Sequence, residues 1–257
     1  MKNNINDYDK FAEKRQQDLI NGMKPSHRFV EKPMMKSMLP DLKNKKILML
    51  GCGTGEESKL LETFGASSKQ LKGIDLSNKS IETAKNTYPD IEFVVGDMNN
   101  LPFENECFDF VYSSLAIHYN ATPEKTYKEV YRVLKPDGLF LFSVGHPLRW
   151  GSEEKNIENE TIRIIGCSKN DDGNKVYGKY NSFEKHIFSS FAWQNDNEVL
   201  SFYVGSPSMH FKLLRQAEFE ILDFTESKCV EEAKKVDMNY YIKNSEIPQF
   251  MAFLAKK

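Results

Sequence analysis

The feature that most constrains the fold is a short apolar strand that runs directly into three closely spaced glycines. Residues 47–55 are Ile-Leu-Met-Leu-Gly-Cys-Gly-Thr-Gly, and a stretch of helical character follows. Because glycine has no Cβ, such a turn can bend sharply and let a ligand approach the backbone. A strand, a glycine turn and a helix in this order begin a βαβ unit. The sequence therefore predicts an α/β chain built on a parallel sheet.

Short apolar runs alternate with amphipathic stretches through the first two-thirds of the chain. They predict five consecutive parallel strands, at residues 46–50, 71–74, 91–95, 108–113 and 139–144. The intervening pattern predicts helices at residues 54–63, 77–87 and 123–134, and two more before the first strand at residues 8–21 and 26–38. Since fully apolar strands are buried on both sides, we expect helices on both faces of the sheet.

The pattern changes after Val144. Residues 145–206 are polar, with extended aromatic segments at 186–193 and 199–204, and Gln194–Asn197 between these segments predicts a hairpin turn. This composition predicts a β-rich insertion after the fifth strand. Beyond it we expect a helix at residues 209–216 and strands at 220–225 and 249–255.

Composition and charge exclude several classes of protein. The 257 residues are 40% hydrophobic, enough for a real core, and 35 basic against 37 acidic residues leave no basic surface for nucleic acid. A polar N-terminus and the lack of any run near ~18 apolar residues argue against secretion and membrane insertion. The cysteines have no metal-site spacing, so we expect no metal and a reducing, cytoplasmic location; they are Cys52, Cys107, Cys167 and Cys229.

The glycine spacing argues against a dinucleotide ligand. Gly51, Gly53 and Gly55 form G-x-G-x-G, whereas a dinucleotide fingerprint needs its third glycine at position 56, where this chain has Glu56. A carboxylate at the start of the helix would repel a pyrophosphate at the same helix end. The spacing therefore favours a ligand without phosphate.

Two aspartates follow the next two predicted strands. Asp75 lies where an acid can accept hydrogen bonds from both ribose hydroxyls. Asp97 can accept from an exocyclic amine, and the thioether of Met98 can lie against an aromatic ring. Because the carboxyl ends of parallel strands meet at one edge of the sheet, these residues and the glycine turn predict a crevice for an adenosine without phosphate.

At this point the chain resembles the class I S-adenosylmethionine-dependent methyltransferases, over roughly residues 46–144. The resemblance is carried by five ordered motifs: Leu50–Gly55, Gly73–Ser77, Gly96–Met98, Phe108–Leu115 and Val133–Phe140. The segments Ser114–Tyr119 and Phe142–Pro147 look like the small-molecule, methyltransferase type 11-like branch of that family, and Ile247–Lys256 is similar to its usual last strand.

The resemblance implies one domain over residues 1–257 with a Rossmann-like, seven-stranded, mostly parallel sheet and an antiparallel last strand. It implies N-terminal helices at 1–40 that form part of a lid, a cofactor-binding core at 41–145, an insertion at 146–206 that caps the substrate, and a C-terminal part of the sheet at 207–257. S-adenosylmethionine would be the cofactor and S-adenosylhomocysteine the product. The implied cofactor-binding residues are Tyr8, Gly51, Cys52, Gly53, Thr54, Gly55, Asp75, Leu76, Asp97, Met98 and Ser113.

One position departs from the family pattern. Many members carry an acid two residues before the first glycine that helps to hold the methionine ammonium group, whereas this chain has Met49. The ammonium group must find other acceptors. The backbone carbonyls of the glycine loop and of Ser113 are possible acceptors, and so is Glu31 in the second predicted N-terminal helix.

The expected function is transfer of a methyl group to a small-molecule acceptor by in-line displacement. His118 and His146 follow the fourth and fifth strands, where the methyl group should point, and are the candidate catalytic residues because either can accept a proton near neutral pH; alternatively, His118 starts or caps the following helix and His146 fixes the chain before the insertion. We expect a monomer or homodimer without nucleic-acid or membrane partners. Two alternatives stay open: a non-catalytic S-adenosylmethionine-binding sensor, suggested by Met49, and a nicotinamide-dependent oxidoreductase, disfavoured by Glu56.

Overall fold

The computed structural model describes residues 25–157, 160–170, 173–189 and 199–257. The helix predicted at residues 8–21, the cofactor contact predicted for Tyr8 and the hairpin turn predicted at residues 194–197 therefore lie outside the described residues.

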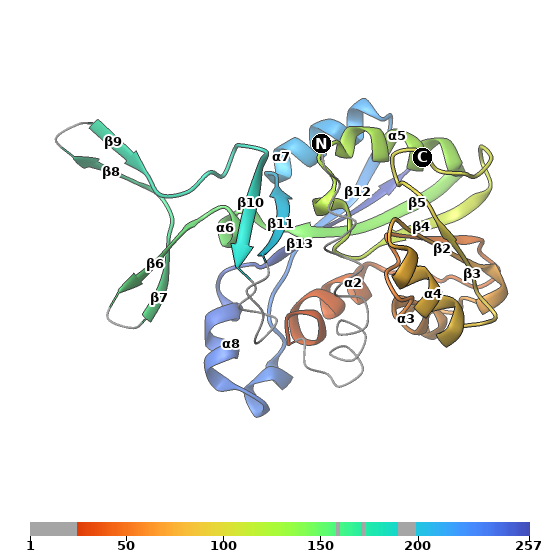
Figure 1. The fold of residues 1–257 in the computed structure, drawn as a ribbon, viewed down its shortest axis with the longest axis horizontal. Coiled ribbons are helices and arrows are strands. Elements are labelled where there is room, and N and C mark those ends of the chain that lie inside the picture. The colour runs from red at the N-terminus through yellow and green to blue at the C-terminus, as the bar shows by residue number, and fades with distance from the viewer. Residues whose placement is uncertain (1–24, 158–159, 171–172, 190–198) are drawn as a thin grey trace.

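A seven-stranded sheet forms the centre of the molecule, in the order β12-β13-β5-β4-β1-β2-β3 (Figure 1). Its strands are β1 (Ile47–Leu50), β2 (Leu71–Asp75), β3 (Glu92–Val95), β4 (Phe108–Ser113), β5 (Leu134–Gly145), β12 (Glu220–Glu226) and β13 (Phe250–Lys256). Strands β1 to β5 pair in parallel, and β13 is antiparallel to both of its neighbours. The predicted mostly parallel sheet with an antiparallel last strand is confirmed.

Helices cover both faces of this sheet, as predicted (Figure 1). One face packs against α2 (Lys32–Met38), α3 (Glu57–Thr63), α4 (Asn78–Thr87) and α8 (Met238–Ser245), and the other against α5 (Pro123–Val133) and α7 (Pro207–Gln216). The central strand β1 is consequently buried along its whole length. This double cover explains why its sequence is a continuous apolar run rather than an alternating one.

Three predicted boundaries differ from the structure for local reasons. Helix α3 begins at Glu57 rather than Thr54, because Gly55 has a φ of +85° and still belongs to the turn. Strand β5 begins at Leu134, five residues before the predicted start, and that first residue pairs with Phe108 of β4. The helix predicted over residues 26–38 is divided into a π-helical turn, η1 (His27–Glu31), followed by α2. Short 3-10 turns complete the chain: η2 (Ser68–Gln70), η3 (Ile117–Tyr119) and η4 (Glu231–Lys235).

The predicted β-rich insertion is confirmed. After the short helix α6 (Pro147–Trp150) come three antiparallel pairs: β6 (Glu153–Ile157) with β7 (Glu160–Ile164), β8 (Cys167–Asn170) with β9 (Gly173–Val176), and β10 (Glu184–Ser189) with β11 (Val199–Val204). The β6–β9 hairpins extend away from the sheet (Figure 1), whereas β11 contacts η3, the turn that follows β4. Strand β11 therefore brings the insertion to the carboxyl end of β4.

Candidate functional site

Side-chain packing and positive φ angles both restrict which residues the glycine loop can contain. A Cβ on Gly51 would lie 2.3 Å from Cβ of Ala116, and one on Gly55 would lie 2.9 Å from Cζ of Phe93. A Cβ on Gly53 would meet nothing within 4 Å, although its φ of +53° is in the left-handed region. Packing thus requires glycine at 51 and 55, while Gly53 faces open space into which a ligand can come close to the backbone.

Asp75 ties this loop to the next helix. Its Oδ2 accepts a hydrogen bond from the Gly53 N–H at 2.8 Å, and its Oδ1 accepts from the Ser77 N–H at 3.0 Å. The side chain of Leu76, which follows it, is 39% exposed. The acid predicted to bind the ribose therefore lies beside the glycine loop at the carboxyl end of β2, and it also shapes that loop.

Asp97 and Met98 follow β3 at the same edge. The Asp97 side chain is exposed, and its Oδ1 accepts from the Asn99 N–H at 2.8 Å. Met98 is half-buried, and its Cε lies 3.6 Å from the point where a Cβ on Gly51 would be. The Gly96 N–H donates to the Asp75 carbonyl at 2.9 Å, which links the ends of β2 and β3. The structure therefore brings the glycine loop, both acids and Met98 to one edge.

The other predicted cofactor residues of the core are buried around the loop. The Cys52 N–H donates to the Ile74 carbonyl at 3.0 Å. The Thr54 hydroxyl donates to the Glu56 carboxylate. The Ser113 hydroxyl donates to the Leu50 carbonyl at 2.9 Å and so joins the ends of β4 and β1. The side chains of Thr54 and Ser113 thus bond to the protein itself, and contact with a ligand would involve their backbone groups.

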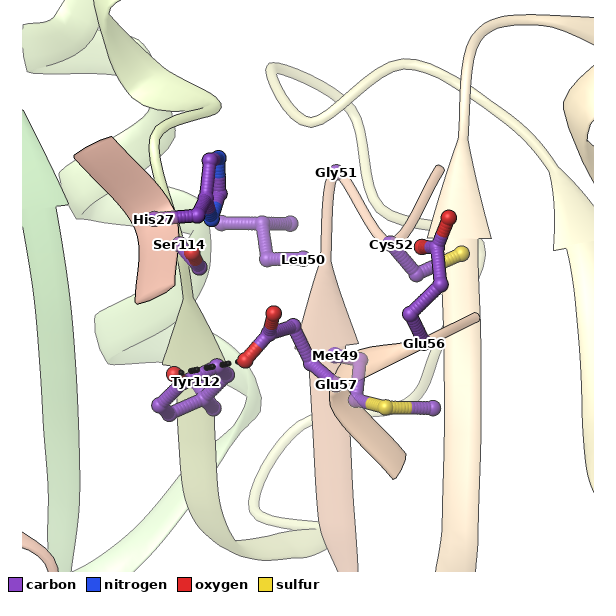
Figure 2. A pocket seen from close by; sticks show the side chains of 9 residues that line it. All are labelled: His27, Met49, Leu50, Gly51, Cys52, Glu56, Glu57, Tyr112 and Ser114. Atoms are coloured by element: carbon purple, nitrogen blue, oxygen red, sulfur yellow. Dashed lines mark hydrogen bonds between the residues drawn. The ribbon is translucent and has the colours of Figure 1, made fainter. Parts of the chain in front are cut away.

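A small cavity lies between the ends of β1 and β4 (Figure 2). It has a volume of about 20 Å³, room for roughly one water-sized group, and its lining residues are His27, Met49, Leu50, Gly51, Cys52, Glu56, Glu57, Tyr112 and Ser114. Glu57 points toward Tyr112, whose hydroxyl donates to Glu57 Oε2 at 3.1 Å. Glu57 Oε1 lies 3.3 Å from the Lys32 ammonium group, so this carboxylate has a cationic partner.

A second carboxylate, that of Glu31, contacts two of the residues that line the cavity, Ser114 and His27. Its Oε1 accepts from the Ser114 hydroxyl at 2.8 Å and from the Ser143 hydroxyl at 2.7 Å. Its Oε2 lies 3.6 Å from His27 Nδ1 and has no hydrogen-bond partner among the described residues. The side chain is fully buried.

Burial raises the Glu31 pKa from 4.5 to about 7, and repulsion by Glu57 adds to the increase, against the hydrogen bonds from Ser143 and Ser114 and the charge of Lys32. The sequence pointed to Glu31 but not to its partners. Ser114, Ser143 and His27 are common residue types whose proximity is created only by the sheet and the π-helical turn.

His118 lies in η3 at the carboxyl end of β4. Its ring is buried against Tyr119 and Phe202, with centroid distances of 4.4 and 5.1 Å, and its Nδ1 accepts from the Gly145 N–H at 3.3 Å. A neutral imidazole that accepts at Nδ1 carries its proton on Nε2. In this arrangement His118 is a hydrogen-bond donor at Nε2.

His146 is fixed at both ring nitrogens. Its Nδ1 accepts from the Leu148 N–H at 3.2 Å and so caps α6, and its Nε2 lies 2.7 Å from Glu226 Oε1. Burial lowers its pKa, against the opposing effect of Glu226. The neutral ring, with its proton on Nε2, joins the end of β5 to β12.

Comparison with known proteins agrees with this geometry. A family model described as a methyltransferase domain matches residues 48–142. The chain is 32% identical over 191 residues to phthiotriol/phenolphthiotriol dimycocerosates methyltransferase 1 of Mycobacterium ulcerans. This alignment covers 67% of this chain and 68% of that protein. This chain belongs to the class I S-adenosylmethionine-dependent methyltransferases. Its Rossmann-like fold and its place in the methyltransferase type 11-like branch agree with the family match.

Two further relatives show how far the likeness extends. The malonyl-[acyl-carrier protein] O-methyltransferase of Pectobacterium atrosepticum is 28% identical over 107 residues, which span 42% of this chain and only 41% of that enzyme. The crystal structure of an S-adenosylmethionine-dependent methyltransferase from Mesorhizobium loti is 24% identical, covers 88% of this chain and 97% of its own, and superimposes with a TM-score of 0.67. This second likeness extends the shared fold to most of the methyltransferase chain.

The residues present fit the cofactor of this family. Gly53 leaves open space beside the backbone, Asp75 and Asp97 lie at adjacent strand ends, and the acids around the small cavity disfavour a phosphate. Within the described part of the chain, no group of three or more His, Cys, Asp and Glu side chains is arranged to hold a metal ion. No helix there is long and apolar enough to cross a membrane.

Proposed function

We propose that this methyltransferase transfers a methyl group from S-adenosylmethionine to a small-molecule acceptor by in-line displacement. The observation that carries the proposal is the bond between Asp75 Oδ2 and the Gly53 N–H, which ties an acid to a glycine loop with open space beside it. When bound, the cofactor supplies a methyl group already activated on a sulfonium, so the protein mainly has to position the acceptor.

Each end of the proposed cofactor site has its own residues. Asp75 would accept hydrogen bonds from the ribose, Asp97 would accept from the adenine amine, and Met98 would lie against the base. The backbone of residues 51–55 would lie along the ligand, and the partly exposed side chain of Leu76 would contact it at the outer edge of the site. This arrangement is supported by the meeting of β1, β2 and β3 at one edge, and Glu56 at the loop favours an adenosine without phosphate.

The acceptor would lie near η3 and β11. His118 is the residue we propose to contact it, because its ring lies at the carboxyl end of β4 against Phe202 of the insertion. His146 would act as a positioning residue, since both of its ring nitrogens already bond to the protein. The substrate-capping role of residues 146–206 rests on β11, which runs beside η3.

The cellular setting is also part of the proposal. None of the four cysteines, all of which lie in the described residues, forms a disulfide, which is compatible with a reducing cytoplasm. We propose a monomer or homodimer acting on a freely diffusing acceptor.

Isothermal titration with S-adenosylhomocysteine tests the proposed cofactor site. We expect binding by the unmodified protein and a loss on the order of 10- to 100-fold in Asp75→Asn, since a charged hydrogen-bond partner is removed. Asp90→Asn is the matched control, because Asp90 is an exposed acid in the turn before β3. Equal affinity in all three proteins, or no binding to any of them, would overturn the proposal.

Turnover separates catalysis from the alternatives. Radiolabelled methyl transfer to a panel of small acceptors should reveal a product. Tight cofactor binding without transfer to any acceptor would instead support the sensor function. Binding of a nicotinamide dinucleotide in equilibrium dialysis would support the oxidoreductase.

A further inference from the structure

This chain has Met49 where many family members carry an acid that helps to hold the methionine ammonium group of the cofactor. In the proposed complex that ammonium group therefore needs another acceptor. Met49 is buried and lines the same cavity as Ser114 and His27. A carboxylate at position 49 would therefore have been directed toward this cavity. Glu31 does not line the cavity itself but accepts a hydrogen bond from Ser114 and lies 3.6 Å from His27, two residues that do.

We propose that Glu31, acting through the Ser114 hydroxyl, supplies the negative charge that holds the ammonium group at the amino-acid end of the cofactor. The inference rests on the proposed function. In this chain the charge would come from the π-helical turn η1 rather than from strand β1, and Ser114, which lines the cavity, would connect it to the ligand.

The hydrogen-bond directions support this role. The Ser114 hydroxyl donates its proton to Glu31 Oε1, so the serine oxygen presents acceptor capacity to a neighbouring cation. The cavity volume of about 20 Å³ matches a single ammonium-sized group rather than a nucleoside. The Glu31 carboxylate, the Ser114 hydroxyl and the ammonium group would then be joined by charge-assisted hydrogen bonds, which are stronger than hydrogen bonds between neutral groups.

The surrounding charges distinguish Glu31 from the other acid beside it. Glu57 is paired with Lys32 and accepts from Tyr112. Glu31 is fully buried, and its Oε2 has no hydrogen-bond partner among the described residues. A buried carboxylate oxygen without a hydrogen bond is costly by itself, and an arriving cation stabilises it. The turn that carries Glu31 is a π-helix, a conformation found frequently at functional sites.

Cofactor binding would then be coupled to proton release. The groups that face Glu31 are His27 of η1, Lys32 of α2, Glu57 of α3 and Tyr112 of β4. Burial holds the Tyr112 pKa well above its usual value, so this phenol stays neutral. Because the Glu31 pKa is about 7, part of the protein carries a proton there at neutral pH, and an incoming ammonium group would displace it.

The test compares S-adenosylhomocysteine with its desamino analogue, which lacks only the ammonium group. The unmodified protein should bind S-adenosylhomocysteine on the order of 10- to 100-fold more tightly than the analogue. In Glu31→Gln and in Ser114→Ala this preference should largely disappear, while affinity for the analogue changes little. Titrations at pH 7 in buffers of different ionisation enthalpy should show proton release in the unmodified protein and none in Glu31→Gln.

Two controls separate this role from a structural one. Ser143→Ala removes the other serine that donates to Glu31 but does not line the cavity, so it should keep most of the preference. Glu56→Gln makes the same charge change at an acid that does line the cavity, and it should keep the preference as well.

The possible outcomes are distinguishable. Loss of the preference in Glu56→Gln but not in Glu31→Gln would overturn the inference, and so would equal weakening of both ligands by Glu31→Gln. If the unmodified protein binds neither ligand, the proposed function itself fails. If Glu31→Gln does not fold, the pair Ser114→Ala and Ser143→Ala decides the matter.

Discussion

The glycine-loop edge and the β6–β9 hairpins are built in opposite ways. At the edge, residues from β1, β2, β4 and α3 bond to one another across long sequence separations, and a single added methyl group at Gly51 would collide with Ala116. In the hairpins, strands pair with their immediate sequence neighbours, and a Cβ at Gly166 or Gly173 would meet nothing within 4 Å. This methyltransferase therefore has its strictest packing where the cofactor is expected, whereas the hairpins depend on local pairing.

Gly51→Ala should give the largest effect. Its Cβ would lie 2.3 Å from that of Ala116 at a φ of +65°. Overpacking and a strained backbone each cost about 1–3 kcal/mol, so we expect a loss of roughly 4 kcal/mol in the free energy of unfolding, measured by urea denaturation. Gly53→Ala, which has open space but a similar φ of +53°, is the matched control; it should lose only the backbone-strain part, about 1–3 kcal/mol, while weakening S-adenosylhomocysteine binding. Equal free energies of unfolding for the two variants would contradict the conclusion that packing against Ala116 restricts position 51.

Glu31→Gln should stabilise the ligand-free protein at high pH. The Glu31 pKa is raised from 4.5 to about 7, so the folded state keeps a proton that the unfolded state releases between these values. The stability of the unmodified protein therefore falls as pH rises through this window, and the glutamine variant avoids that loss. Calorimetry should show that the two proteins have equal free energies of unfolding below pH 4.5. Above pH 7 the free energy of unfolding of Glu31→Gln should be about 3 kcal/mol larger. A difference independent of pH would contradict the titration of Glu31.

His146→Ala tests the junction between the core and the insertion. Loss of the cap on α6 and of the bond to Glu226 should cost about 1–2 kcal/mol in the free energy of unfolding. His146→Asn keeps a side-chain acceptor for the Leu148 N–H and should recover part of this loss. If turnover falls in both variants by much more than their stabilities explain, His146 takes part in the reaction rather than in positioning.

Excision of residues 153–177 should have the smallest effect on cofactor binding. Ser152 and Gly178 form a β-bridge and the Lys179 N–H donates to the Gly151 carbonyl at 2.9 Å, so the chain ends left by the excision are already adjacent. With a short glycine linker, we expect S-adenosylhomocysteine affinity to stay within about twofold, since no cofactor residue is removed. A large loss, measured by titration calorimetry, would show that the hairpins support the cofactor edge. Altered acceptor turnover alone would support their role as a cap.

Local patterns were sufficient for the core of the fold. The apolar runs predicted the parallel strands, and the three glycines predicted a turn whose constraints the packing of Gly51 and Gly55 explains. The same reasoning missed the early start of β5 at Leu134, because pairing with β4 rather than local composition extends that strand. It also gave no sign of the π-helical turn, which depends on how the chain packs before α2.

The residues along the chain were enough to predict the order of strands and helices and the turn at the three glycines, because these depend on residues close together in the sequence. The tertiary structure alone decided which polar groups meet: Glu31 with Ser114 and Ser143, separated by 83 and 112 residues, and His146 with Glu226, separated by 80. Such meetings follow from burial against a completed sheet. For Glu31 the electrostatic consequence, a raised pKa, appears because burial excludes water from its carboxylate.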